Sequence, residues 1–559
     1  MSLPNFSAQS ALFTTLTTGF FGSQDRYRLF AEKISPVLVR ARATLEQAYC
    51  SDNGRPGIEP ILLAGVTLLQ FLEGVPDRQA VEMLHYHLGW QFALNRNVES
   101  AAFHPSTLAN FRQRLIGHDL SRVVFNQLLE ALQQVGLVER QGKQRLDSTQ
   151  VMGLLSRMSR LECVRETLRL ALQELEQSAA LFHKPGWWPT LVDRYVSSKL
   201  DYRTEANLLK EKMNQAGADA WTLIEWVKQL SASAIGQGPQ YQLLGRVLGE
   251  NFQCSESGVT EQRHAQPAGA VHNPHEPEAQ WAAKGQGKHK KEHVGYKVQV
   301  AESVGSEPLA KGEPTRSFLT GIATQPAIAS DEAGAEQIQK EQATMGLDKP
   351  SEMYVDGAYI SAEKLAQAHA EGRELIGPAP AAPQRDGRFS SEDFQVRVED
   401  RRAVCPAGKP STQCSRLEEK ESGHVNYRFE WSYHCKNCPL RDKCVGADQP
   451  HRTLVVGQHH TELQTRRQEQ KTEAFQEKSR RRNAIEGTQS ELVRAHGLRK
   501  ARYRGLEKNR LQNYFIGAAC NAKRWIRRMV WEIRQAEIGA KLSPMAGCAG
   551  ESCVLAGQK

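Results

Sequence analysis

Apolar residues recur at helical spacing throughout the first part of the chain. The runs Gly57 to Leu72 and Arg78 to Leu94 place an apolar residue at every third or fourth position, and Gly74-Val75-Pro76 separates them. A third run, Ser106 to Leu115, has the same spacing and begins with a residue type that caps helices. Such spacing is typical of amphipathic helices. The pattern therefore predicts a helical domain over residues 1–140.

In the segment that follows, the helical spacing gives way to an alternation of polar and apolar residues. From Gln144 to Val151, polar residues alternate with Leu and Val, which predicts a strand that presents Asp147 among polar neighbours. The runs His293 to Val300 and Phe318 to Thr324 also have the composition of strands. We expect these three segments to join one sheet.

A helix and a further strand complete this region. The pattern predicts a helix from about Asp331 to Met345, and Met353 to Val355 is typical of a buried strand that ends on Asp356. Active sites of open α/β sheets gather at the carboxyl ends of strands, so this aspartate is a candidate metal ligand; a simple Asp-Gly turn is the alternative. Three strands, a crossover helix and a further strand predict an α/β fold with a mixed sheet flanked by helices, built from residues 141–158 and 285–384.

Two insertions interrupt the predicted sheet. In residues 159–284, a leucine-rich helical pattern starts at Ser159 and continues with breaks to about Glu250, and a loop rich in Pro, His, Gly and Gln follows. Residues 385–460 form the second insertion and are rich in cysteine. We predict a helical insertion for the first and a small Cys-rich insertion for the second.

The Cys-rich insertion has the residue types of a zinc site. It contains a Cys-x2-Cys pair with further cysteines on both sides, which is compatible with tetrahedral zinc coordination. Thiols that are merely buried or reduced are the alternative. The candidate zinc ligands are Cys405, Cys435, Cys438 and Cys444, with Cys414 as a substitute for one of them.

Positive charge is concentrated near the C-terminus. From Thr461 to Gln535 the chain has 19 Lys and Arg residues against 8 Asp and Glu residues, a net charge of +11, whereas the whole chain carries +9. A basic segment interleaved with aromatic residues is the pattern expected of a protein that binds nucleic-acid phosphates. A solvated helical face is the alternative.

Helical spacing returns in this basic segment, residues 461–535. One helix is predicted from Thr472 to His496, with Gly497 as its C-cap, and a second carries an apolar stripe from Leu511 to Met529 that should dock on the sheet. The opposite side of the second helix carries the basic residues Lys508, Lys523, Arg524, Arg527 and Arg528. Residues 536–559 are rich in small residues and are predicted to be a disordered tail.

Two arginines of the third N-terminal run are candidates for DNA contacts. Arg112 and Arg114 lie off its apolar stripe, which suggests a DNA-binding head; a purely structural bundle is the alternative. The chain starts without the pattern of a secretory signal, and its longest apolar run is too short to cross a bilayer. We therefore expect a cytoplasmic protein, not a membrane protein, whose 11 cysteines are reduced.

Several short motifs, taken in their order along the chain, resemble one known family. The sequence is similar to the DDE transposases of bacterial insertion sequences, with an InsH-type helical N-terminal domain. The resemblance implies an RNase H-like catalytic core and a nucleoid-associated protein. The matching segments are Ser106–Leu115, Arg145–Thr149, Glu276–Trp281, Val294–Lys297, Val355–Tyr359, Arg482–Gly487 and His496–Gly505.

The resemblance also implies roles for individual residues. Asp147, Asp356 and Glu486 would form the catalytic acidic triad and bind Mg²⁺ or Mn²⁺, while Arg482 would contact a phosphate or orient a carboxylate. Glu477 and Glu491 lie on the same predicted helix and are the alternatives for the third acid. The chain departs from the family at two positions, where Ser479 and Val493 replace a common tyrosine and lysine. The other residues implied to bind phosphate are Arg494, Arg499, Lys500 and Arg502.

The family resemblance implies a transposase that acts on double-stranded DNA. Such a protein binds the terminal inverted repeats of its element and catalyses metal-dependent DNA cleavage and strand transfer, as a homodimer in the paired-end complex. The alternatives are an RNase H-like nuclease that does not join strands and a catalytically inactive, zinc-containing DNA-binding protein. The sequence leaves the recognised ends, the target preference and the cleavage pathway open.

Overall fold

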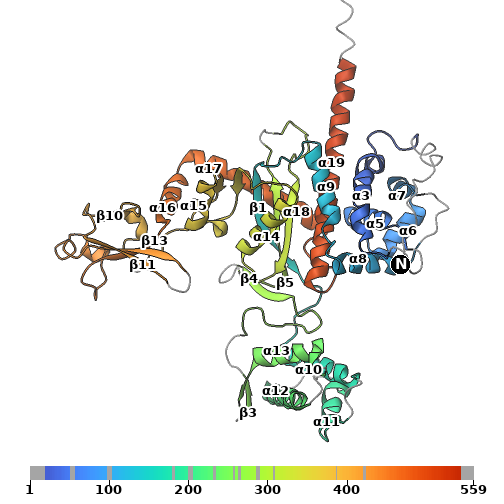
Figure 1. The fold of residues 1–559 in the computed structure, drawn as a ribbon, viewed down its shortest axis with the longest axis horizontal. Helices are drawn as coiled ribbons and strands as arrows, with labels where there is room; N and C mark the ends of the chain where they lie inside the picture. Colours follow the sequence, from blue (N-terminus) through green and yellow to red (C-terminus); the bar gives the residue numbers. More distant parts are fainter. Residues whose placement is uncertain are drawn as a thin grey trace, which may run out of the picture.

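A mixed sheet stands at the centre of the molecule, and helices surround it (Figure 1). The computed structural model describes residues 19–50, 57–96, 103–178, 183–198, 206–230, 235–255, 258–261, 266–284, 290–305, 309–384, 387–419 and 423–542. No helix in these ranges is long and apolar enough to cross a membrane.

The N-terminal region is helical, as its apolar spacing predicts. The predicted run from Arg78 to Leu94 is two helices, because the extended backbone of His87 separates them and its side chain caps the second helix at Trp90. The elements are α2 (Arg26–Leu29), η1 (Phe30–Ile34), α3 (Ser35–Arg40), α4 (Arg42–Glu46), α5 (Pro60–Glu73), α6 (Asp77–Tyr86), α7 (Leu88–Ala93), α8 (Ser106–Gly117) and α9 (Val123–Gln134). Helix α5 is buried on most of its surface and ends at Gly74 in the left-handed conformation (φ 74°).

The central sheet contains antiparallel and parallel strands. Its path is β6–β5–β1–β7–β8, in which β1, β5 and β6 are antiparallel neighbours and β7 runs parallel to both β1 and β8. The strands are β1 (Gln144–Met152), β4 (Gln280–Lys284), β5 (Lys291–Ser303), β6 (Leu319–Pro326), β7 (Glu352–Tyr354) and β8 (Glu374–Ile376). The predicted mixed sheet is confirmed. Strand β4 lies in the segment predicted to be the first insertion, but it pairs with the start of β5 and belongs to this sheet.

The register of the parallel pair determines where the two candidate aspartates lie. Gln144 pairs with Met353 and Arg145 pairs with Tyr354. Side chains alternate along a strand, so extending this register by two residues places Asp147 level with Asp356.

The long C-terminal helix α19 (Leu506–Leu542) docks on the sheet and on the N-terminal helices at once. It packs on β6 of the sheet and on α5 and α9 of the N-terminal region. Gly517 permits the close approach to the sheet, since a Cβ at this position would lie 2.1 Å from the Ile322 side chain. Phe515 stacks on Phe71 of α5, with ring centroids 5.9 Å apart. A single apolar core therefore runs through the N-terminal region, the helix and the sheet.

Two features of the C-terminal segment differ from the sequence prediction. The helix expected from Thr472 to His496 is divided into α17 (Glu473–Ser479), the 3₁₀ turn η8 (Arg480–Asn483) and α18 (Ala484–His496), and Gly497 closes it in the left-handed conformation as expected. The predicted disordered tail is helical as far as Leu542, where α19 ends, and the remainder of that tail lies outside the described residues.

The remaining helices frame the sheet and connect it to the second insertion. Helix α14 packs on β5 and β6, and α15 packs on α16, which contacts the Cys-rich region at β9. These elements are α14 (Asp331–Thr344), η5 (Gly357–Tyr359), α15 (Ala362–Ala370) and α16 (His460–Glu469).

The two insertions project from the sheet in different directions (Figure 1). The first forms its own apolar core, which includes Leu168, Leu172 and Leu223. Its elements are α10 (Arg160–Glu176), α11 (Trp188–Val192), η2 (Asp193–Ser197), α12 (Ala206–Gln229), η3 (Ile235–Gln237), α13 (Pro239–Asn251), β2 (Phe252–Ser255) and β3 (Gly258–Glu261). The Cys-rich insertion consists of η6 (Ser391–Asp393), β9 (Gln395–Arg397), β10 (Arg402–Val404), β11 (Gln413–Glu418), β12 (Val425–Glu430), η7 (Arg441–Lys443) and β13 (Thr453–Gly457).

Candidate active site

Asp147 and Asp356 meet at one guanidinium group. The Arg482 Nη2 atom lies 3.1 Å from Asp147 Oδ2 and 3.7 Å from Asp356 Oδ2. Strand β1 supplies the first carboxylate, the residue following β7 by two supplies the second, and the turn η8 supplies the arginine. Three segments that are far apart in the sequence therefore bring two negative charges and one positive charge to the same place.

The two aspartates differ in their surroundings. The side chain of Asp147 is 16% exposed, and its Oδ1 accepts a hydrogen bond from the Ser148 N–H at 2.8 Å. The side chain of Asp356 is 53% exposed, and its Oδ1 accepts one from the Gly357 N–H at 2.6 Å, which starts the turn η5. Both aspartates thus have one oxygen held by the backbone and the other directed to Arg482.

Glu486 lies on the first turn of α18, beside the same strand. The Gln489 Nε2 atom donates to the Ser148 carbonyl at 3.3 Å, and the Arg145 Nη1 atom donates to the Arg481 carbonyl at 3.1 Å, so both η8 and α18 are attached to β1. Residues three apart share a helical face, which places Glu486 on the side of α18 that carries Gln489. The Glu486 side chain is exposed.

The alternative acids have different surroundings. Glu491 Oε1 lies 3.2 Å from Lys523 Nζ, and its Oε2 lies 3.0 Å from Arg524 Nε, so this carboxylate pairs with α19. Glu477 is exposed on α17. Because Glu491 is already paired with two cations of α19 and Glu477 lies on another helix, we favour Glu486 as the partner of the two aspartates.

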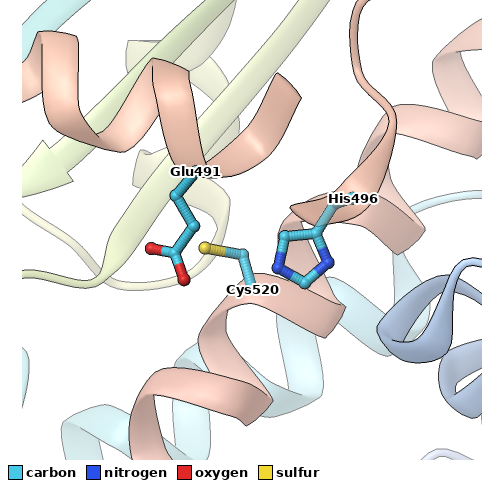
Figure 2. A group of neighbouring side chains, drawn as sticks. All are labelled: Glu491, His496 and Cys520. Carbon is cyan, nitrogen blue, oxygen red and sulfur yellow. The ribbon is translucent and has the colours of Figure 1, made fainter. Parts of the chain in front are cut away.

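The carboxylate oxygens of Asp147, Asp356 and Glu486 do not all lie within 4.8 Å of one another. Among the described residues, the one group of three potential metal ligands whose atoms all lie within 4.8 Å of one another is Glu491, His496 and Cys520. Figure 2 shows the Cys520 sulfur between the Glu491 carboxylate and the His496 ring. Burial raises the pKa of Cys520 to about 12 and lowers that of His496 to about 4. The thiol is therefore neutral and the carboxylate is already balanced by cations, so we interpret this group as part of the packed core.

A buried ionic network lies next to the candidate site. Glu302 is fully buried (0% exposed) and pairs with Arg145, its cross-strand neighbour on β5 and β1, and with Arg524 of α19, whose Nη1 atom is 3.0 Å away. The Thr488 hydroxyl of α18 donates to Glu302 Oε2 at 2.7 Å. Sequence reasoning missed Glu302 and placed Arg524 on an exposed basic flank; the Arg524 side chain is in fact 3% exposed. The network joins β1, β5, α18 and α19 around one carboxylate.

Two of the arginines expected to bind DNA are engaged inside the protein. Arg112, predicted to face DNA, is 6% exposed; it pairs with Asp77 of α6 and stacks on Tyr503, with its Cζ atom 4.9 Å from the ring centroid. Arg502 stacks on Phe71 and donates to the Val75 carbonyl at 3.3 Å. The helical pattern shows only that a residue lies off the main apolar stripe, and here a second contact surface covers that side.

The other predicted phosphate-binding residues differ in exposure. Arg114 is half-buried and stacks on Tyr49, with its Cζ atom 4.6 Å from the ring centroid. Arg494, Arg499 and Lys500 have exposed side chains. The backbone of the last two is fixed, since the Arg499 carbonyl accepts a hydrogen bond from Met152 N–H at the end of β1. Arg499 and Lys500 therefore lie beside the end of the strand that carries Asp147.

Substitution of Arg112 tests whether this arginine stabilises the fold, through its ion pair with Asp77, and does not contact DNA. We expect Arg112→Ala to lower the free energy of unfolding by about 2 kcal/mol, because it leaves Asp77 without its charged partner. The matched variant Arg494→Ala, at an exposed position, should leave stability within about 0.5 kcal/mol and reduce the salt dependence of DNA binding. Thermal melts and anisotropy titrations at several salt concentrations measure both. Weakened DNA binding by an equally stable Arg112→Ala protein would contradict the internal role.

The four predicted zinc ligands face one cavity. Cys405, Cys435, Cys438 and Cys444 line a single small cavity of about 20 Å³ in the Cys-rich insertion, together with Trp431. Cys414, the proposed substitute, is paired with Phe429 across β11 and β12 and does not line the cavity.

Comparisons with known proteins identify two domains. Residues 404–526 match the family "Transposase DDE domain", and residues 20–114 match the family "Transposase domain (DUF772)". The first match includes Glu486 and Arg482, whereas Asp147 and Asp356 lie before it. None of the curated proteins and none of the solved structures that were compared with the chain gives a match.

Proposed function

We propose, since the chain belongs to the insertion-sequence DDE transposases, that it binds the terminal inverted repeats of its element, cleaves DNA there and transfers the strands to a target. The observation that carries this proposal is the meeting of Asp147 and Asp356 at Arg482. Two carboxylates from adjacent parallel strands are suited to phosphodiester chemistry because they can share hard divalent cations.

The strand order supports an RNase H-like core. The path β6–β5–β1–β7–β8 has three antiparallel strands followed in the sheet by two parallel ones, and α18 lies against β1. In this arrangement β1, which carries Asp147, lies next to β7, which leads to Asp356, and α18, the helix of Glu486, contacts β1. We assign these three residues as the catalytic acids.

The donor set fits Mg²⁺ or Mn²⁺. Asp147, Asp356 and Glu486 offer carboxylate oxygens only, and such oxygens together with water and substrate phosphates are the ligands that these ions prefer. When bound, the ions supply activation of the attacking oxygen and stabilisation of the leaving oxygen. Arg482 keeps a positive charge between the two aspartates and is placed to hold a phosphate oxygen of the scissile strand.

The proposed reaction has two chemical steps. In the first, a water oxygen forms a bond to the phosphorus at the end of the element, the bond to the 3′-oxygen breaks, and this oxygen leaves as a 3′-hydroxyl. In the second, that hydroxyl attacks a target phosphodiester and displaces another 3′-hydroxyl. No oxidant or reductant is needed. Exposed Arg494, Arg499 and Lys500 would contact phosphates of the bound duplex, and two copies of the chain would hold the paired ends.

The experiment uses the full-length protein and linear DNA that carries the inverted repeats flanking the gene. We expect Mg²⁺-dependent breaks at the repeat ends, and joined products when target plasmid is added, with neither in EDTA. Breaks without joined products would support a nuclease of the same fold. Specific binding without breaks in either Mg²⁺ or Mn²⁺ would overturn the enzymatic proposal in favour of a DNA-binding protein.

A further inference from the structure

We propose that Cys405, Cys435, Cys438 and Cys444 bind one structural zinc ion that holds the Cys-rich insertion in its folded form. The insertion lies between the second and third proposed catalytic acids in the sequence, and zinc binding there does not depend on catalysis. Tetrahedral coordination by four cysteine thiolates is one of the standard structural zinc sites.

The first support is the convergence of the four side chains. Cys405 follows β10, the Cys435 and Cys438 pair follows β12, and Cys444 ends the turn η7. All four line the same cavity of about 20 Å³. A cavity needs about 10–15 Å³ to hold one water molecule, so this space is large enough for a single ion.

The second support is the backbone geometry at the ligands. Gly408 N–H donates to the Cys405 carbonyl at 2.8 Å, and Gly408 has a φ of 72°, so this cysteine sits in a tight turn of the kind that directs a thiol inward. Arg441 N–H donates to the Cys438 carbonyl at 3.1 Å and forms a second turn. The Arg452 N–H donates to the Cys435 sulfur at 3.4 Å. The two turns and the hydrogen bond to the Cys435 sulfur hold the four cysteines around one cavity. No three of their sulfur atoms lie within 4.8 Å of one another, so the thiols would move closer together when an ion binds.

The third support is the charge around the cavity. A zinc ion with four thiolates carries a net charge of −2, which needs cations nearby. Arg441 Nη1 donates to the Cys435 carbonyl at 3.1 Å, and Arg452 Nη1 donates to the Cys444 carbonyl at 3.0 Å. Both guanidinium groups are thereby anchored to ligand residues, and both arginines line the cavity. Two fixed positive charges match the excess negative charge of the site.

The fourth support is the small core of the insertion. Its buried apolar residues include Phe394, Phe429 and Trp431 but also two of the candidate ligands, Cys435 and Cys444. All nine cysteines in the described part of the chain are free thiols, so no disulfide stabilises this insertion there. A unit of this size with so small a core commonly depends on a metal or a cross-link for stability.

The test measures metal in the full-length protein, purified without chelator or histidine tag. We expect about one zinc per chain by mass spectrometry, and an X-ray absorption spectrum with four sulfur neighbours at about 2.3 Å. Cys438→Ser should lower the zinc content at least tenfold. The matched variant Cys414→Ser, which changes a cysteine of the same insertion outside the cavity, should retain the wild-type content.

A second measurement decides the matter if Cys438→Ser does not fold. Wild-type protein grown with Co²⁺ should show the visible absorption bands of tetrahedral cobalt and the intense near-ultraviolet bands of cobalt–thiolate bonds. Wild-type protein that contains no zinc and takes up neither Zn²⁺ nor Co²⁺ would overturn the proposal, as would equal loss of zinc in Cys414→Ser. Neither measurement uses DNA, so its outcome is separate from that of the cleavage and joining assay.

Discussion

Replacing Asp147 with Asn should reduce metal-dependent cleavage of end-containing DNA by about a thousandfold or more, which corresponds to about 4 kcal/mol of lost transition-state stabilisation. The substitution keeps the shape of the side chain but removes the charge that lies 3.1 Å from Arg482 and that would bind the ion. The same loss is expected for Asp356→Asn and Glu486→Gln. Single-turnover cleavage of labelled DNA measures the rate.

The controls separate catalysis from folding and binding. Each variant should bind end-containing DNA within about threefold of the wild-type affinity, because one carboxylate contributes little to phosphate contacts. Glu477→Gln, an exposed acid on α17, should cleave at the wild-type rate. More than a tenth of the wild-type rate in any one of the three variants would remove that residue from the site. Wild-type cleavage by Glu486→Gln together with loss in Glu491→Gln would move the third acid to Glu491.

Glu302→Ala should lower the free energy of unfolding of the core by about 3–5 kcal/mol. The reason is that Arg145 and Arg524 would both remain buried without their shared carboxylate, whereas the wild-type side chain is completely shielded from water. The loss is expected to loosen the attachment of α18 to β1 through Thr488. Chemical denaturation followed by tryptophan fluorescence gives the change in stability, and hydrogen exchange shows where protection is lost.

A surface ion pair provides the comparison. Glu507 pairs with Arg510 at 2.6 Å within the first turns of α19, and its side chain is exposed. Glu507→Ala should change stability by less than about 1 kcal/mol. If Glu302→Ala is as stable as this control, the buried network contributes no net stability, and the attachment of α18 must rest on apolar packing and on hydrogen bonds such as that from Gln489 to the Ser148 carbonyl.

The sequence predicts those features of the site that have a local pattern. Alternation along β1 and the carboxylate after β7 point to Asp147 and Asp356, and the four-residue spacing relates Arg482 to Glu486. The contact of Arg482 with both aspartates has no such pattern, because it depends on the parallel register of two strands and on the turn that divides the predicted helix.

Buried charges are where sequence reasoning fails here. Arg112 and Arg524 both lie off the main apolar stripe of a helix, which ordinarily indicates exposure to solvent. Each is covered by a second partner and neutralised there, Arg112 by Asp77 and Arg524 by Glu302. The apolar spacing of a helix identifies its main buried face. It does not show whether the opposite face is exposed to solvent or packs on another element. The short strand β8 is also missed.

Helix α19 fixes the position of the N-terminal region relative to the central sheet. Its apolar side contacts the sheet that carries Asp147 and the helices of the N-terminal region at the same time, with Phe515 against Phe71 and Gly517 against Ile322. If the N-terminal helices bind a DNA duplex, this packing holds that duplex at a fixed distance from the carboxylates, because no flexible linker separates the two regions in the part of the chain that the structure describes. Deletion of the N-terminal helices would expose the apolar residues of α19 that pack on α5 and α9, so we expect the N-terminal region and the sheet not to fold as independent units.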